Sequence, residues 1–369
     1  MDDTVYQCTY CNKIIKKPQT PVWLCNCGKP LYVCYEWEGN SREQLIDKKN
    51  NSLWRYTSVF PEQCINDKVS LKEGWTPLIP IDNNVYVKNE TVNPTGSFKD
   101  RGMAMAVTMA KIQNVEKICL PSAGNAGVSA SAYCQKAGIE CFVFLPETIP
   151  DPFINETNRY NAELVLSGQT ISEAAKTMIN KMDDDWFDIS TLKEPFRIEG
   201  KKTLGYEIAE QFNWSLPDVI IYPTGGGTGL IGMWKAFKEM IGMGWISGHL
   251  PRMVVVQSDG CAPVVDAFKK KNIITDFWSN SETIALGLNV PGPLGGYIIL
   301  DIISESNGIA IAVPESTLEV ETEIFRNKTG IDASAEAGVV WSVYNTLLQD
   351  EWIKPKEKVV LFATGIERR

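Results

Sequence analysis

The sequence contains a single histidine, His249, among its 369 residues. Catalytic triads and catalytic metal centres generally use histidine as a base or a ligand. One histidine, with no serine or cysteine nucleophile motif beside it, nearly excludes both kinds of site. If the protein is an enzyme, proton transfer must fall to Lys, Asp, Glu, Tyr or a cofactor.

Long apolar runs and an excess of positive charge are also absent. The sequence has no run of about 18 apolar residues, and Met1 to Thr4 have neither the basic nor the apolar part of a signal peptide, so we expect a cytoplasmic protein without a membrane partner. The formal net charge of -9 at pH 7 argues against a general nucleic-acid binder. The length of 369 residues suffices for two domains.

Cysteine is scarce and unevenly distributed. The chain has ten cysteines, and four of them form two close pairs, Cys8 with Cys11 and Cys25 with Cys27. So few cysteines in so long a chain exclude a disulfide scaffold. Two close pairs can place four thiolates around a zinc ion, which is then structural because no coordination position stays open. We therefore expect residues 1–38 to form a zinc-ribbon-like appendage, and the alternative is a loosely attached segment with free cysteines.

Beyond about residue 85, short apolar runs rich in β-branched residues alternate with helical patterns. Strands are predicted at 85–88, 117–120, 141–145, 218–222, 253–257 and 358–362, and helices at 103–112, 128–137 and 230–240. Such alternation predicts an α/β fold with parallel sheets covered on both faces.

Lys99 stands at an unusual place for a lysine. It follows Pro94 and Gly96, which predict a turn, and Ser97, which we expect to cap the next helix. Lys99 then lies in the first helical turn, where the helix dipole favours anions over cations. A cation there indicates an anionic ligand or a covalent adduct with an aldehyde, and the alternative is a solvated surface lysine.

Two glycine-rich segments follow predicted strands and open predicted helices. Gly225 to Gly229 offers free backbone N–H groups and a helix N-terminus, which suit a phosphate group. The overlapping residues 227–232 also fit the dinucleotide fingerprint, with Asp259 as the acid for a ribose. Ser122 to Gly127, which contains Asn125, is the second segment, although a plain strand-to-helix turn has a similar sequence.

The rest of the chain separates these interpretations. A nicotinamide enzyme has no evident use for Lys99. A pyridoxal phosphate enzyme needs a lysine, a glycine-rich phosphate cradle and a small polar group at the ring nitrogen, for which Thr364 is available after the last predicted strand. A non-catalytic binding protein with the cysteine ribbon as its interaction module is a third alternative.

Five segments occur in the order and spacing of one family: residues 74–78, 93–102, 122–127, 225–229 and 364–365. With them the chain resembles the fold-type II pyridoxal phosphate enzymes, and among these it is most similar to the threonine synthases. The resemblance implies an α/β fold of two parallel-sheet domains with the cofactor between them. We expect a smaller domain at 86–195 with the lysine, and a larger one made of 39–85 and 196–369 with the phosphate loop.

The resemblance also implies roles for single residues. Lys99 would form the Schiff base with pyridoxal 5'-phosphate, and Asn125 would contact the 3-hydroxyl of its ring. Thr364 would lie beside the ring nitrogen without holding it protonated, which favours elimination and replacement over transamination. The cofactor phosphate would be held by Gly225, Gly226, Gly227, Thr228 and Gly229, and the substrate by Ser122, Arg197 and Lys201.

The activity implied is the conversion of O-phosphohomoserine and water to threonine and phosphate. The family often has Asn-Ser where this chain has Thr191 and Leu192, and Leu192 cannot donate a hydrogen bond. The alternative is therefore β-replacement or deamination of a serine- or threonine-like amino acid, phosphorylated or not, as in a cysteate synthase or a threonine dehydratase. In either case we expect a homodimer that acts on a small, anionic amino acid.

Overall fold

The computed structural model of the chain describes residues 4–16, 18, 21–36 and 41–368. These residues form two compact units. Unit 1 takes the described residues within Met1–Trp75, Asn93–Thr203 and Arg368–Arg369, and unit 2 takes Thr76–Val92 and Leu204–Glu367. Compact units are not folding domains, so the domain bounds expected from the sequence stay a prediction. Within the expected appendage, residues 1–3, 17, 19–20 and 37–38 lie outside the described residues.

Unit 1 begins with a small antiparallel sheet. Its strands β1 (Val5–Cys8), β2 (Ile14–Lys16) and β3 (Leu31–Cys34) are arranged in the order β2-β1-β3. Alternate residues of β1 and β3 are buried, and the ring of Tyr6 packs edge-to-face on Phe196, with 6.0 Å between ring centroids. This packing anchors the small sheet to the rest of unit 1, although the sheet itself holds few apolar residues.

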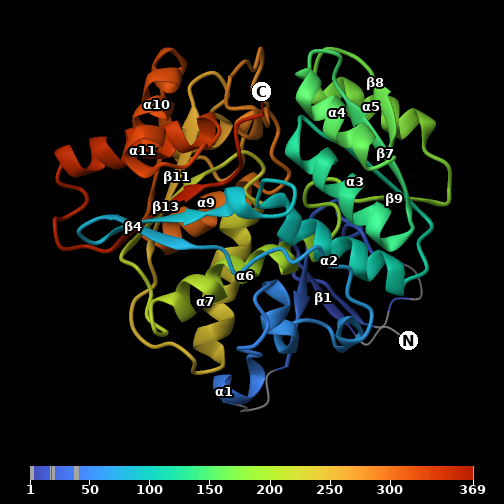
Figure 1. Ribbon diagram of the computed structural model, residues 1–369, viewed down its shortest axis with the longest axis horizontal. Helices are drawn as coiled ribbons and strands as arrows, with labels where there is room; N and C mark the ends of the chain where they lie inside the picture. Colours follow the sequence, from blue (N-terminus) through green and yellow to red (C-terminus); the bar gives the residue numbers. More distant parts are fainter. Residues whose placement is uncertain (1–3, 17, 19–20, 37–40, 369) are drawn as a thin grey trace. The chain divides into compact units, whose positions relative to one another are not determined.

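A four-stranded parallel sheet forms the centre of unit 1. Its order is β8-β7-β6-β9, and Figure 1 shows helices α3, α4 and α5 around it. Ala174 and Met178 of α5 pack with Cys119 and Phe144 of the sheet. The elements are β6 (Lys117–Pro121), β7 (Glu140–Leu145), β8 (Glu163–Leu166), β9 (Trp186–Asp188), α2 (Lys99–Ile112), α3 (Asn125–Ala137), α4 (Asp151–Arg159) and α5 (Ile171–Lys181).

Unit 2 contains a six-stranded sheet in the order β12-β11-β10-β13-β5-β4. All its neighbours are parallel except β4 and β5, which are antiparallel. The core on one face joins Val219, Ile221 and Leu361 of the strands to Phe325 and Val340 of α10 and α11. The strands are β4 (Leu78–Asp82), β5 (Val85–Asn89), β10 (Val219–Pro223), β11 (Arg252–Ser258), β12 (Ile309–Val313) and β13 (Val359–Ala363).

The strand residues that alternate with this core are buried as well. Ile220, Val255 and Val360 are completely buried, so both faces of the central strands are covered, as a parallel sheet requires. The helices of this part are α7 (Thr228–Gly242), α8 (Pro263–Lys270), α9 (Gly296–Glu305), α10 (Leu318–Thr329) and α11 (Ala335–Gln349). In Figure 1, α10 and α11 lie side by side in orange-red.

The expected α/β fold with parallel sheets is confirmed, and the six predicted strands are found to within about two residues. Helix α6 (Phe196–Gln211) and the single turn α1 (Arg42–Leu45) complete the α-helices of the described residues. Edge strand β4 was not predicted, and it carries Pro80, which an edge tolerates because one side of it is unpaired. Among the described residues, no helix has the length and apolar character needed to cross a membrane.

Candidate active site

Lys99 is the first residue of α2, so the expected position in the first helical turn is confirmed. The residue in the N-cap position is Phe98, and the expectation that Ser97 caps the helix is wrong by one residue. The Ser97 hydroxyl still accepts the N–H of Lys99, at 3.4 Å. Gly96, with φ +78°, makes the turn before the helix, and Lys99 itself is only half-buried. The amine can therefore reach a ligand.

Buried Asp100 fixes the segment that carries Lys99. Its carboxylate accepts the N–H of Thr95 at 2.7 Å, the hydroxyl of Thr95 at 2.5 Å and the hydroxyl of Ser129 on α3 at 2.6 Å. Burial raises the pKa of Asp100 to about 6, although these hydrogen bonds act against the rise. The turn 93–98, α2 and α3 are thus held together directly beside the lysine.

Lys201 lies near Lys99 because α2 and the first half of α6 pack very closely. A Cβ atom on Gly200 would lie 1.8 Å from the carbonyl oxygen of Arg101, and one on Gly102 would lie 2.9 Å from Lys201. The Nζ atoms of Lys99 and Lys201 lie 4.1 and 4.7 Å from the centroid of the Phe98 ring. Burial, with the charges of Arg197 and Lys99, lowers the pKa of Lys201 well below its usual range.

Arg197 belongs to the same group of cations. Its side chain is buried, Nη1 donates to the carbonyl oxygen of Ile189 at 2.8 Å, and Nε has no hydrogen-bond partner in the described part of the chain. Glu194 accepts the backbone N–H of Phe196 at 2.6 Å and that of Arg197 at 2.8 Å, and so caps α6. Burial lowers the pKa of Arg197 to about 10, which leaves the guanidinium charged at neutral pH.

Leu192 occupies a strained backbone position in the loop before Arg197. Its φ is +65°, in the left-handed region that a branched side chain rarely adopts, and its side chain is buried. Such strain persists only where the surrounding structure enforces it, and it is common at binding sites. No pattern in the sequence predicts this strain, because the residue type shows only that Leu192 cannot form a hydrogen bond through its side chain.

The turn before α3 is held by Ser122. Its hydroxyl accepts the N–H of Gly124 at 3.1 Å and that of Gly127 at 2.9 Å, and it donates to the carbonyl oxygen of Gly124. These contacts use its one donor and both acceptor positions. The Ser122 hydroxyl therefore stabilises this turn, and its contact with a substrate stays a prediction. Asn125, the first residue of α3, is half-buried, and its Oδ1 accepts a hydrogen bond from Arg368 at 2.9 Å.

The glycine-rich loop of unit 2 joins β10 to α7. Three of its glycines have no space for a side chain. A Cβ atom on Gly225 would lie 2.5 Å from the oxygen of Gly287, one on Gly227 would lie 2.3 Å from Ile299, and one on Gly229 would lie 1.9 Å from the hydroxyl of Tyr222. Packing alone thus requires these glycines. Within the described residues, however, the backbone N–H groups of Gly225, Gly226, Gly227 and Gly229 donate no hydrogen bond. A row of free donors at a helix N-terminus fits a phosphate group.

Thr364 directly follows β13, the strand next to β10. Because Val219 pairs with Val359 and Ile221 with Leu361 in parallel register, the loop after β10 and Thr364 leave the sheet at the same edge. Thr364 is buried. The two parts of the predicted site in unit 2 therefore lie at one edge of one sheet, where ligands of α/β folds bind.

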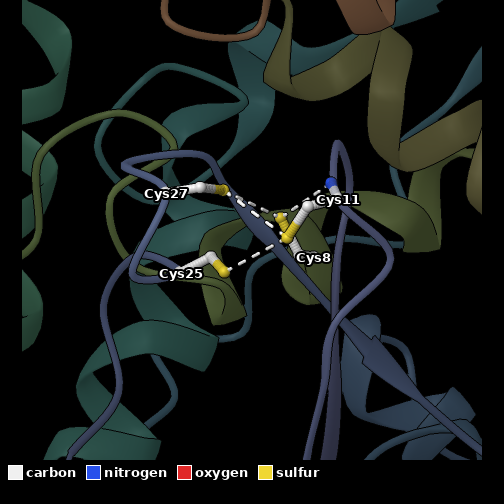
Figure 2. Close-up of side chains that lie close together, drawn as sticks. All are labelled: Cys8, Cys11, Cys25 and Cys27. Carbon is white, nitrogen blue, oxygen red and sulfur yellow. Dashed lines mark hydrogen bonds between the residues drawn. The ribbon is translucent and has the colours of Figure 1, made fainter.

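The four N-terminal cysteines come together in unit 1, as Figure 2 shows. The Sγ atoms of Cys8 and Cys27 are 3.5 Å apart, those of Cys11 and Cys25 3.6 Å, and those of Cys11 and Cys27 3.7 Å. Four thiolates around one zinc ion lie about 3.8 Å from one another, so the cluster fits this ion. Burial opposes ionisation of Cys8, but the N–H groups of Cys11 and Tyr10 and the neighbouring thiols lower its pKa to about 7.

Comparison with known proteins gives a consistent result. Residues 69–365 match the family described as pyridoxal-phosphate dependent enzyme. The threonine synthase of Methanocaldococcus jannaschii is 33% identical over 373 residues, which cover 97% of this chain and 91% of the relative. The threonine synthase of Bacillus sp. (strain ULM1) is 30% identical over 322 residues, covering 85% and 88%.

Solved structures share the fold at lower identity. The processed form of threonine deaminase isoform 2 from Solanum lycopersicum has a TM-score of 0.66 at 20% identity, covering 96% of this chain and 95% of that one. A fungal L-serine ammonia-lyase from Rhizomucor miehei has a TM-score of 0.70 at 20% identity, covering 79% and 94%. These likenesses show the fold. The family match favours the pyridoxal phosphate interpretation over the nicotinamide one. The chain therefore belongs to the pyridoxal-phosphate dependent enzymes of fold type II.

Proposed function

We propose that the protein is a threonine synthase, which converts O-phosphohomoserine and water to threonine and inorganic phosphate. Two observations support this activity over others of the same fold. Two relatives named threonine synthase match 97% of the chain, at 33% and 27% identity. The second observation is the buried guanidinium of Arg197, which suits the phosphate group of the substrate.

The residues of the chain fit pyridoxal 5'-phosphate. We assign Lys99 as its covalent attachment point, the free N–H groups of Gly225, Gly226, Gly227 and Gly229, with Thr228, as the holders of its phosphate, Asn125 as the contact of its 3-oxygen and Thr364 as the group at its ring nitrogen. When bound, the cofactor supplies an electron sink for carbanions next to its imine carbon. A threonine hydroxyl is a neutral partner and leaves the ring nitrogen unprotonated, which supports elimination and replacement over transamination.

Lys99 is also the residue assigned to proton transfer. With a substrate in the site, the Nζ of Lys99 would take a proton from the α carbon of the substrate and return protons to its carbon chain. A lysine in this role agrees with a chain that has only one histidine, since His249 is largely exposed and contacts Asp218.

The buried Arg197 is the observation that carries the choice of substrate. A charged guanidinium with an unpartnered Nε is costly in a protein interior, and an anion that accepts from this nitrogen removes the cost. The amine of Lys201 lies beside it and can donate a hydrogen bond to the same anion. The two acids that act on Arg197 are already engaged: Glu194 accepts backbone N–H groups of α6, and Asp188 pairs with Lys193 at 2.8 Å. O-phosphohomoserine carries a phosphate group that suits this site, whereas serine and threonine carry no second anion.

The test is to incubate the purified enzyme with O-phosphohomoserine and, separately, with threonine, serine and phosphoserine. We expect equal amounts of inorganic phosphate and threonine from O-phosphohomoserine, and no 2-oxo acid from threonine. A 2-oxo acid from serine or threonine, without release of phosphate from O-phosphohomoserine, would assign a deaminase instead. Leu192 favours this second candidate, because it supplies no hydrogen bond to a phosphate.

Three further proposals concern the whole protein. The cysteine cluster would hold a structural zinc ion through Cys8, Cys11, Cys25 and Cys27. The enzyme would work as a homodimer in the cytoplasm and bind neither nucleic acid nor membranes. Metal analysis and light scattering of the purified protein test the first two of these proposals.

A further inference from the structure

Arg368 is bonded to two segments that the proposed function assigns to the cofactor. Its Nε donates to Oδ1 of Asn125 at 2.9 Å, and its Nη2 donates to the backbone carbonyl oxygen of Thr95. The guanidinium also lies over the ring of Phe153, 5.5 Å from the centroid. All four residues belong to unit 1. Burial lowers the pKa of Arg368, and the carboxylates of Glu156 and Asp100 act in the opposite direction.

The contact decides how the side-chain amide of Asn125 is oriented. A guanidinium has five N–H donors and no acceptor, so it can only face the oxygen of the amide. The NH₂ group of Asn125 must then point to the other side and is left to donate. Without Arg368 both orientations of the amide are open, because rotation by half a turn about the last bond exchanges oxygen and nitrogen at little cost.

The second contact reaches the lysine segment. Thr95, whose carbonyl oxygen accepts from Arg368, donates its own N–H and hydroxyl to Asp100, the residue after Lys99. Asp100 in turn accepts from Ser129 on α3. Arg368 therefore closes a ring of polar contacts that links the turn 93–98 with the N-terminal half of α3. Of the two hydrogen-bond acceptors of Arg368, Asn125 is itself assigned to the cofactor, and Thr95 is hydrogen-bonded to Asp100, the neighbour of Lys99.

We propose that Arg368 is a positioning residue: it holds the amide of Asn125 so that its NH₂ group donates to the 3-oxygen of the cofactor ring, and it holds the turn that carries Lys99. This inference rests on the proposed function, since it needs Asn125 to contact the cofactor. Arg368 itself does not contact the reacting atoms.

A double-mutant cycle on cofactor affinity tests the inference. The dissociation constant of pyridoxal 5'-phosphate is measured for the wild type, Arg368→Met, Asn125→Ala and the double variant, all prepared as apoproteins. We expect Arg368→Met to weaken binding about tenfold in the wild-type background and by a clearly smaller factor in the Asn125→Ala background, where only the contact with Thr95 is left to lose. An equal loss in both backgrounds would overturn the inference.

Two further variants separate positioning from a general loss of stability. Arg252 is the matched control, because it too donates to a carbonyl oxygen (Trp352, 3.0 Å) and a side-chain oxygen (Glu357, 2.6 Å) and stacks on a ring (Trp352, 3.9 Å). Arg252→Met should leave the dissociation constant unchanged, and an equal effect of both Met variants would overturn the inference. Arg368→Lys keeps the positive charge and can donate to one of the two acceptors, so it should recover part of the affinity. This variant is the one to measure if Arg368→Met does not fold.

The outcomes also distinguish this inference from the proposed function. If Asn125→Ala binds the cofactor about tenfold or more weakly than the wild type while Arg368→Met and Arg368→Lys bind it normally, only the inference is overturned. If the wild-type apoprotein does not bind pyridoxal 5'-phosphate at all, the proposed function is overturned and the inference with it.

Discussion

At the residue scale, two buried cations, Lys88 and Arg197, differ in how completely their donors are hydrogen-bonded. The Nζ of Lys88 donates to Glu207 at 2.7 Å, to the carbonyl oxygen of Thr76 at 2.7 Å and to Gln211 at 3.0 Å, so all three of its donors are used. Arg197 is equally buried, but its Nε is left without a partner among the described residues. A buried ion whose donors are all used has none left for a ligand, whereas one with an unused donor can bind an acceptor group of a ligand.

We predict that Arg197→Met raises the KM for O-phosphohomoserine about 30- to 100-fold, because it removes a charge-assisted hydrogen bond to the substrate phosphate. Cofactor affinity should stay the same. Steady-state assays of phosphate release measure the first quantity, and absorbance titration of the apoprotein measures the second. Arg252→Met serves as the control, and a KM for Arg197→Met equal to that of the control would contradict the assignment.

Asp100 gives a prediction about pH. Burial raises its pKa from 3.8 to about 6 in the folded chain, so the folded state binds this proton more tightly than the unfolded state does. The stability that Asp100 contributes is full below pH 3.8 and is lost as the pH rises through about 6. The wild type should therefore lose about 2 to 3 kcal/mol relative to Asp100→Asn between pH 4 and pH 7.

Urea unfolding of the apoproteins at both pH values measures this difference. Asp185→Asn is the control, since Asp185 is exposed and its hydrogen bond with Lys117 lowers its pKa instead. A constant difference between the wild type and Asp100→Asn across this pH range would show that the carboxyl of Asp100 is not perturbed.

At the scale of elements, the glycine-rich loop combines packing with binding. Gly227 has φ +73°, and a Cβ atom there would lie 2.3 Å from Ile299. The glycines let the loop lie against its own unit, while the N–H groups of Gly225, Gly226, Gly227 and Gly229 donate no hydrogen bond to a described residue. The same positions thus serve the fold and the predicted phosphate site, which is why the motif is visible in the sequence.

We predict that Gly227→Ala destabilises the apoprotein by about 2 to 4 kcal/mol, through backbone strain and overpacking, and weakens cofactor binding at least tenfold. Gly244 is a matched control in the same unit, because it has φ +68° but nothing within 4 Å of a Cβ atom. Gly244→Ala should show the strain alone, with normal cofactor affinity. Equal effects of the two variants on affinity would argue against the loop as the phosphate site.

The cysteine cluster is the second element with a prediction. We expect one zinc ion per chain, and we expect Cys11→Ser to abolish its retention and to lower the melting temperature. Cys34→Ser is the control, since Cys34 lies on the neighbouring strand β3 but outside the cluster of four thiols. Mass spectrometry for metals and differential scanning calorimetry provide the readouts. Wild-type protein purified without chelators and free of zinc would contradict the assignment.

At the scale of the whole molecule, local patterns in the sequence predicted the α/β fold with parallel sheets and led to the segments that we propose for the site. Strands β6, β10 and β13 are apolar runs, and Lys99 and Gly225 to Gly229 stand at junctions that glycine and proline mark. These signals are local because they depend on neighbouring residues. The N-cap at Ser97 was misjudged by one residue, as helix ends often are.

Local patterns do not predict contacts between residues that are far apart in the sequence. The bond between Arg368 and Asn125 joins residues 243 positions apart, and no pattern of spacing predicts it. The unpartnered Nε of Arg197 is likewise visible only once the burial of the side chain and the position of Ile189 are known. Lone arginines are common on protein surfaces, so their roles come from the structure rather than from their type.

The central claim is that Lys99 is the covalent attachment point of pyridoxal 5'-phosphate, and one measurement tests it directly. The wild type and Lys99→Ala are loaded with the cofactor, reduced with borohydride to make the linkage permanent, digested and mapped by mass spectrometry. We predict a yellow wild type with the pyridoxyl group on the peptide containing Lys99, and no labelled peptide from Lys99→Ala. A label on Lys201 or another lysine of the wild type, or an unlabelled wild type, would contradict the claim.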